Sequence, residues 1–77
     1  MKLWIVIYVV GKIGATVGPI PYDESECWVR AAQSWSELDD KVVTEQGYTK
    51  DDVQFKCEWH AERPEHDPMF GPVQERR

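Results

Sequence analysis

Four residues of the chain carry side chains that bind soft metals or form disulfides: Cys27, Cys57, His60 and His66. In number they match a Cys2His2 zinc site. Cys57 and His60 lie three positions apart, however, and such residues on a strand point to opposite faces. Cys27 also lacks the second cysteine, two to four residues away, that zinc-binding sequences usually have. We therefore predict no metal site and no cofactor, and keep a Cys/His metal or redox module only as an alternative.

The two cysteines are compatible with three states: reduced, disulfide-bonded or metal-bound. A disulfide would join a predicted helix start to a predicted strand, and it would persist only in an oxidising compartment. In a cytoplasmic protein, Cys27 and Cys57 are expected to be small, buried, reduced side chains. We predict a cytoplasmic protein in which both cysteines are reduced. Glu26 and Glu58 adjoin the two cysteines, and a negative neighbour disfavours a reactive thiolate. We therefore expect no nucleophilic catalysis and no enzyme.

Acidic residues dominate the middle of the chain. Residues 23–52 hold nine acidic residues against three basic ones, and the net charge of the 77 residues is −5. This balance argues against direct binding of nucleic acid, whose phosphates need clustered cations, and against anionic membranes. It favours a protein partner with a basic surface, although acidic helix faces are often simply solvated. The predicted acidic contacts are Glu37, Asp39, Asp40, Asp51 and Asp52.

The apolar run from Leu3 to Val10 is the strongest structural signal in the sequence. It is too short to cross a membrane, which takes about 20 residues. Ile13 stands where a signal-peptide cleavage site ending at Ala15 needs a small residue. β-Branched and aromatic residues dominate the run, as they do in strands. We predict a strand here, then a turn at Gly11 and a weakly apolar edge strand over 12–17.

A single helix is predicted from Glu24 to Gln46. Asp23 is the expected N-cap, with Glu26 completing a capping-box pattern, and Gly47 suits the C-terminal cap. Apolar residues recur at spacings of three and four along this segment, which predicts one core-facing stripe: Trp28, Ala31, Trp35, Leu38 and Val42. Residues 53–60 then alternate between apolar and polar, which is typical of a half-buried strand, with Trp59 also assigned to the core.

The order strand, strand, helix, strand defines an α+β fold, ββαβ. The first strand is apolar at every position, as a central strand should be, whereas the second resembles an edge. We therefore predict a three-stranded, antiparallel-type sheet of order 2-1-3, with one helix packed on one face. This domain spans residues 1–62, and prolines and the loss of periodicity after residue 62 predict an extended C-terminal tail at 63–77.

An apolar central strand leaves one face of the sheet without a cover from the helix. Successive residues of this strand point to opposite faces, so one alternating set packs on the helix. The sequence does not decide whether this is the set with Leu3, Ile5 and Ile7 or the other set, and this parity stays open. An uncovered apolar face marks an interaction site, so we predict partner contacts at Trp4, Val6 and Tyr8. The cover is the tail, through Met69, Phe70 and Val73, or a second copy in a homodimer, or a different protein.

In size, charge and layout, the chain resembles small inhibitors carried by phages and mobile elements, including anti-CRISPR proteins. The resemblance includes no residue motif, so no site residue follows from it. It implies a small, acidic, non-catalytic binding protein that blocks a basic, nucleic-acid-handling host complex by protein–protein contact. The alternative outside this class is a homodimeric structural or assembly protein.

Overall fold

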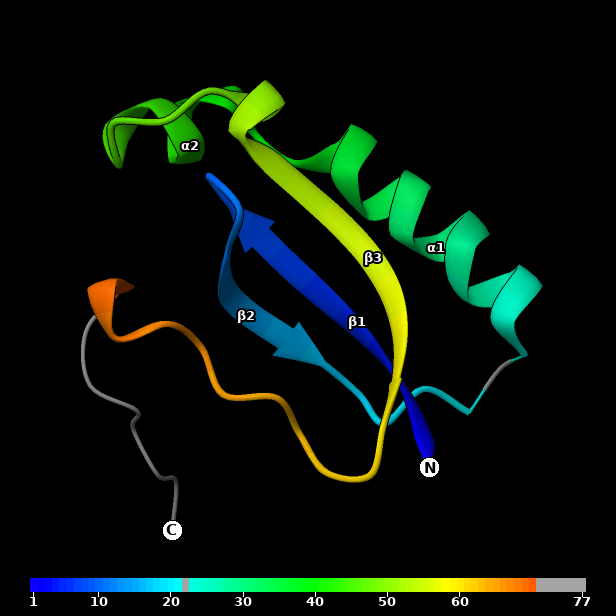
Figure 1. The fold of residues 1–77 in the computed structure, drawn as a ribbon. Helices are drawn as coiled ribbons and strands as arrows, with labels where there is room; N and C mark the ends of the chain where they lie inside the picture. The colour runs from blue at the N-terminus through cyan, green and yellow to red at the C-terminus, as the bar shows by residue number, and fades with distance from the viewer. Residues whose placement is uncertain (22, 71–77) are drawn as a thin grey trace, which may run out of the picture.

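The fold consists of a three-stranded antiparallel sheet and one main helix packed against it (Figure 1). A computed structural model describes residues 1–21 and 23–70. The strands pair in the order β2-β1-β3, as predicted. The elements are β1 (Lys2–Val9), β2 (Lys12–Val17), α1 (Glu24–Glu37), α2 (Asp40–Glu45) and β3 (Val53–His60), with one-turn 3-10 helices at Lys50–Asp52 and Pro68–Phe70.

The central strand β1 is buried on both faces. It pairs antiparallel with both neighbours, with an irregularity in the β2 register between Ile7 and Tyr8. Leu3, on the face toward α1, is 2% exposed, and Val6, on the opposite face, is 0% exposed. The parity that the sequence left open is therefore settled: Leu3 and Ile5 belong to the core cluster beneath α1, and Ile7 packs against it.

The predicted single helix is two helices. α1 ends at Glu37, and Leu38 adopts an extended conformation with ψ of 124°. The Asp39 side chain then accepts a hydrogen bond from the backbone N–H of Lys41 and starts α2. An aspartate that caps a new helix competes with continuation of the old one. Asp39 and Asp40 therefore stand at the start of a helix, where negative charge is favourable, and not inside one continuous helix as predicted.

Cys27 and Cys57 form a disulfide between α1 and β3. The prediction of reduced cysteines is therefore wrong for this structure. The helix begins alongside β3 and brings the two Cα atoms within 6.2 Å, a separation that a disulfide spans readily. Both cysteines are buried and belong to the core cluster with Ala31. The cross-link thus lies inside the small core and fixes which side of α1 faces the sheet.

The C-terminal tail covers the outer edge of β2. The backbone N–H of Asp67 donates to the Ile13 carbonyl at 2.7 Å, and the Arg63 guanidinium donates to the Thr16 and Gly18 carbonyls at 3.5 and 3.2 Å. An edge covered in this way is protected from pairing with other chains. The tail thus closes one of the two edges of the sheet, and the remaining edge belongs to β3.

Candidate functional site

The outer edge of β3 is open over part of its length. The backbone N–H of Val10 donates to the Asp52 carbonyl at 2.8 Å, so the backbone of Asp52 faces β1. Backbone groups alternate in direction along an antiparallel strand, and those of Val53 and Phe55 therefore point away from β1. The Val53 carbonyl accepts a hydrogen bond from Trp35 Nε1 at 2.9 Å. Within residues 1–21 and 23–70, no hydrogen bond takes the outward N–H or carbonyl of Phe55.

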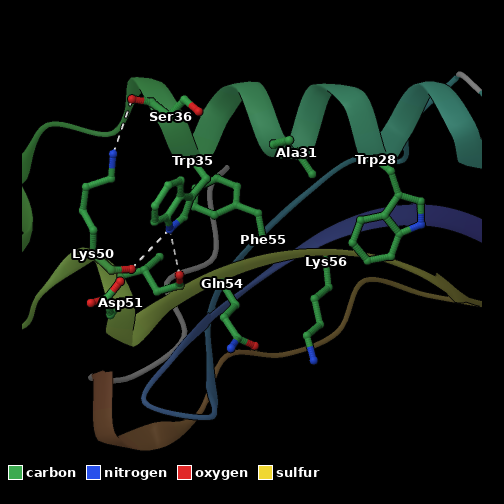
Figure 2. Close-up of a pocket in the computed structure, with 11 residues that line it drawn as sticks. Trp28, Ala31, Trp35, Ser36, Lys50, Asp51, Gln54, Phe55 and Lys56 are labelled. Atoms are coloured by element: carbon green, nitrogen blue, oxygen red, sulfur yellow. Dashed lines mark hydrogen bonds between the residues drawn. The ribbon is translucent and has the colours of Figure 1, made fainter.

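A groove of about 740 Å³ runs between this edge and α1 (Figure 2). Figure 2 shows the side chains of Gln54 and Lys56 directed away from α1, so the main chain of β3 and the Phe55 ring form one wall. The helix forms the other wall with two aromatic and three small side chains, and its lining residues there are Trp28, Ala31, Ala32, Trp35 and Ser36.

Trp35 closes one end of the groove and is fixed on both sides. Its Nε1 donates to the carbonyls of Lys50, at 3.2 Å, and of Val53. The Lys50 ammonium lies 4.3 Å from the centroid of the Trp35 ring and donates to the Ser36 carbonyl. At the other end, Trp28 is 44% exposed. The groove therefore has a rigid aromatic wall at one end and an accessible tryptophan at the other.

Of the five predicted acidic contacts, Asp51 lines the closed end of this groove. Glu37 follows Ser36, which also lines the groove. The end of α1, α2 and the start of β3 lie together at one end of the molecule (Figure 1), and these elements also carry Asp39, Asp40 and Asp52. Asp39 and Asp52 have local structural roles, since they cap α2 and the 3-10 helix at Lys50–Asp52. Glu37 and Asp51 are exposed.

The predicted apolar contacts lie elsewhere. Trp4 is 5% exposed, donates from Nε1 to the His60 carbonyl and lies beneath the Arg63 guanidinium. Val6 is fully buried on the same face, and Tyr8 is half-buried. This face is turned away from α1, so these residues do not form one surface with the groove. The chain itself covers Trp4 and Val6, and only Tyr8 of the three offers accessible surface to a partner.

The assignment of Trp28 and Trp59 to the core is wrong, since both are nearly half exposed, at 44% and 47%. The buried residues of α1 are Cys27 and Ala31, four positions apart on one side of the helix. The disulfide directs this narrow side toward β3, which leaves Trp28 beside the core. The spacing of Cys27 and Ala31 was the available signal, but the prediction followed the stripe that joins Ala31 to Trp28 and Trp35.

The tail contacts both faces of the sheet: Arg63 at its start lies over Trp4 on the face away from α1, whereas Phe70 reaches the α1 side. Phe70 lines a second cavity of about 420 Å³ between β2 and α2, with Ile7, Val9 and Val43 among its other lining residues. Met69 is largely exposed, and Val73 lies outside the described residues. Of the three tail residues predicted as a cover, Phe70 therefore lies beside apolar strand residues. These are Ile7 and Val9 on the α1 face of the sheet, and not the residues of the opposite face.

A hydrogen-bonded cluster occupies the sheet face away from α1. The Tyr8 hydroxyl donates to Glu58 Oε2 at 2.6 Å, and His60 Nε2 lies 2.8 Å from Glu58 Oε1. The hydrogen bond to Glu58, with burial and the carboxylate charge, raises the pKa of Tyr8 to about 12. Burial alone would raise the pKa of Glu58, but the hydrogen bonds from Tyr8 and His60 hold it below its ordinary value.

The Tyr8–Glu58 bond is expected to produce a pH-dependent component of stability at alkaline pH. Because its pKa is raised, Tyr8 holds its proton more tightly in the folded state, so its contribution is complete below pH 10 and is lost as the pH rises toward 12. The Tyr8→Phe variant lacks this component. Melting temperatures of both proteins from pH 8 to 12 should converge above pH 10, and a constant difference would contradict the assignment.

The described residues hold neither a metal-binding cluster nor a membrane-spanning helix. Within residues 1–21 and 23–70, no group of three His, Cys, Asp or Glu side chains is placed to hold a metal ion. In the same part of the chain, no helix is long and apolar enough to cross a membrane. Comparison of the chain with protein-family models, curated proteins and solved structures finds no significant match.

Proposed function

We propose that this protein is a small, non-catalytic binding protein that acts by protein–protein contact. Its docking surface is the groove between α1 and β3, and the acidic residues at the closed end of the groove attract a partner with a basic surface. The observation that carries the proposal is the combination of an exposed tryptophan, an open strand edge and an acidic border at one place.

Physical chemistry supports each part of this combination. Tryptophan is enriched at the energetic centres of interfaces, and Trp28 is accessible in the free chain. A groove of about 740 Å³ falls within the size range of ligand sites, about 300–1,000 Å³. Exposed carboxylates steer a basic partner and make association sensitive to salt.

The narrower role predicted from the sequence, a phage-type inhibitor of a nucleic-acid-handling complex in the cytoplasm, stays a prediction. The disulfide between Cys27 and Cys57 weighs against the cytoplasm, because disulfides persist mainly in oxidising compartments. It also removes both thiols from the ligand set of the alternative metal module. The homodimer alternative places a second copy on the open β3 edge.

The proposal is tested by affinity capture from the source cell with the wild-type protein, two groove variants and one control variant as baits. The wild-type protein is expected to retain a basic partner at low salt and to release it as the salt concentration rises. A Trp28→Ser variant is expected to lose that partner. A Glu37→Gln/Asp51→Asn variant, which removes two negative charges beside the groove, is expected to retain at least tenfold less of it.

The matched control is Glu62→Gln/Glu65→Gln, which removes the same charge from exposed positions where the domain meets the tail. This control is expected to retain the partner nearly as well as the wild-type protein does. If all four baits recover the same proteins in equal amounts, the groove is not the docking surface. If the wild-type protein instead forms a stable dimer and retains nothing, the homodimer alternative holds.

A further inference from the structure

We infer that the groove takes an extended segment of a partner chain, apolar in its centre and basic at one end, which adds to the sheet as a fourth strand beside β3. This inference rests on the proposed function and specifies how the partner is held. It follows from the hydrogen-bonding groups along the groove, the space between the two tryptophans and the charge at the closed end.

The backbone of Phe55 supplies the hydrogen bonds. Its N–H and carbonyl point into the groove, and within residues 1–21 and 23–70 no hydrogen bond occupies them. One residue of an added antiparallel strand exchanges both N–H···O bonds with such a residue. The Val53 carbonyl is already bonded to Trp35, so the added strand pairs from Phe55 onward, away from the closed end. Pairing at an exposed edge gives affinity without requiring a particular sequence.

The wall opposite β3 has room for the side chains of such a strand. Trp28 and Trp35 are seven residues apart on α1, about 10.5 Å along the helix axis. Side chains on one face of a strand recur about every 6.8 Å, so one or two of them fit between the tryptophan rings. The residues between the rings are Ala31 and Ala32, which leave this space open. Medium-sized apolar side chains such as valine match its lining.

The acidic border sets the charge and direction of the segment. All strand pairs in the sheet are antiparallel, and an added antiparallel strand places its C-terminal end next to the start of β3. Asp51 lines the groove at that end, and the exposed Glu37 adjoins Ser36, another lining residue there. Lys50, which also lines the groove, is held over the Trp35 ring and by the Ser36 carbonyl. Basic residues are therefore expected after the apolar residues of the bound segment.

The test uses a capped synthetic peptide, Thr-Val-Thr-Val-Thr-Arg-Arg, and the full chain with its disulfide intact. Binding is followed by tryptophan fluorescence and by amide hydrogen exchange. We expect the Phe55 amide to exchange at least tenfold more slowly when the peptide is bound. The amides of Gln54 and Lys56, which face β1 in the free chain, are expected to change little.

Two further peptides and two variants separate strand addition from simple charge attraction. A peptide ending in Glu-Glu, and one with proline in place of its central valine, are each expected to bind at least tenfold more weakly. The variant Ala32→Leu fills the groove and is expected to weaken binding of the basic peptide at least tenfold. Gln33→Leu adds the same side chain at the next position of α1, which does not line the groove, and is expected to bind like the wild-type protein.

The outcomes distinguish this inference from the proposed function. If the basic peptide binds but Phe55 gains no protection and the proline peptide binds equally well, strand addition is overturned while docking of a basic partner stands. If no peptide binds at millimolar concentration, strand addition is overturned, and the affinity capture described above decides the proposed function separately. If Phe55 is protected only as the free protein dimerises, a second copy is the occupant and the inference is overturned.

Discussion

Replacing Cys27 and Cys57 together by alanine is expected to lower the free energy of unfolding by about 3–4 kcal/mol. The cross-link joins residues 30 positions apart, and closing a loop of that length removes conformational entropy from the unfolded chain. A core of this size supplies only about 3–5 kcal/mol, so the double variant is expected to be largely unfolded at 37 °C. Urea denaturation followed by far-UV circular dichroism measures the difference.

Reductant provides the control for this prediction. The wild-type protein in reductant is expected to lose most of the same stability, whereas the double variant should not respond to reductant. Mass spectrometry after alkylation should find no free thiol in the untreated wild-type protein. A double variant with a free energy of unfolding within about 0.5 kcal/mol of the wild type would show that the disulfide does not stabilise the fold.

Leu3→Ala is expected to lower the free energy of unfolding by about 2–5 kcal/mol. Leu3 is buried in the core cluster between β1 and α1, so its truncation removes buried apolar area and leaves a cavity. Val6→Ala removes two carbon atoms from the opposite face and is expected to cost about 1.5 kcal/mol or more. The same denaturation experiment measures both variants.

Val29→Ala is the matched control, because Val29 is exposed on α1. Alanine is a better helix former than valine, so this variant is expected to remain within about 0.5 kcal/mol of the wild type. A destabilised Leu3→Ala variant beside an unchanged Val6→Ala variant would mean that only one face of β1 is buried in solution. That result would contradict the position of β1 as a strand enclosed on both faces.

The sheet order could be predicted because the strands differ so clearly in composition. An apolar run from Leu3 to Val10 has no stable place except the centre of a sheet, and β2 is small and weakly apolar, as an edge tolerates. The break between α1 and α2 could not be predicted from periodicity, because Leu38 and Val42 continue the apolar stripe across it. The break depends on Asp39, whose capping bond outweighs the periodicity of the stripe.

The candidate site was only partly predictable. The acidic residues Glu37 and Asp51 could be identified from local charge; Asp51 lines the groove, and Glu37 adjoins the lining residue Ser36. The groove itself depends on which side of α1 faces the sheet, and a disulfide that the sequence left open determines this. Trp28 is exposed because of that orientation. Trp4 is buried for a different reason, because Arg63 of the tail covers it on the face away from α1.

Amide hydrogen exchange of the free, dilute protein tests the central claim, an open β3 edge beside the groove, most directly. The amides of Gln54 and Lys56 face β1 and are expected to be protected, whereas the Phe55 amide between them is expected to exchange at least tenfold faster. This alternation of slow, fast and slow exchange requires no ligand. Equal protection of all three amides in the monomer would contradict the account, because the edge of β3 would then be occupied.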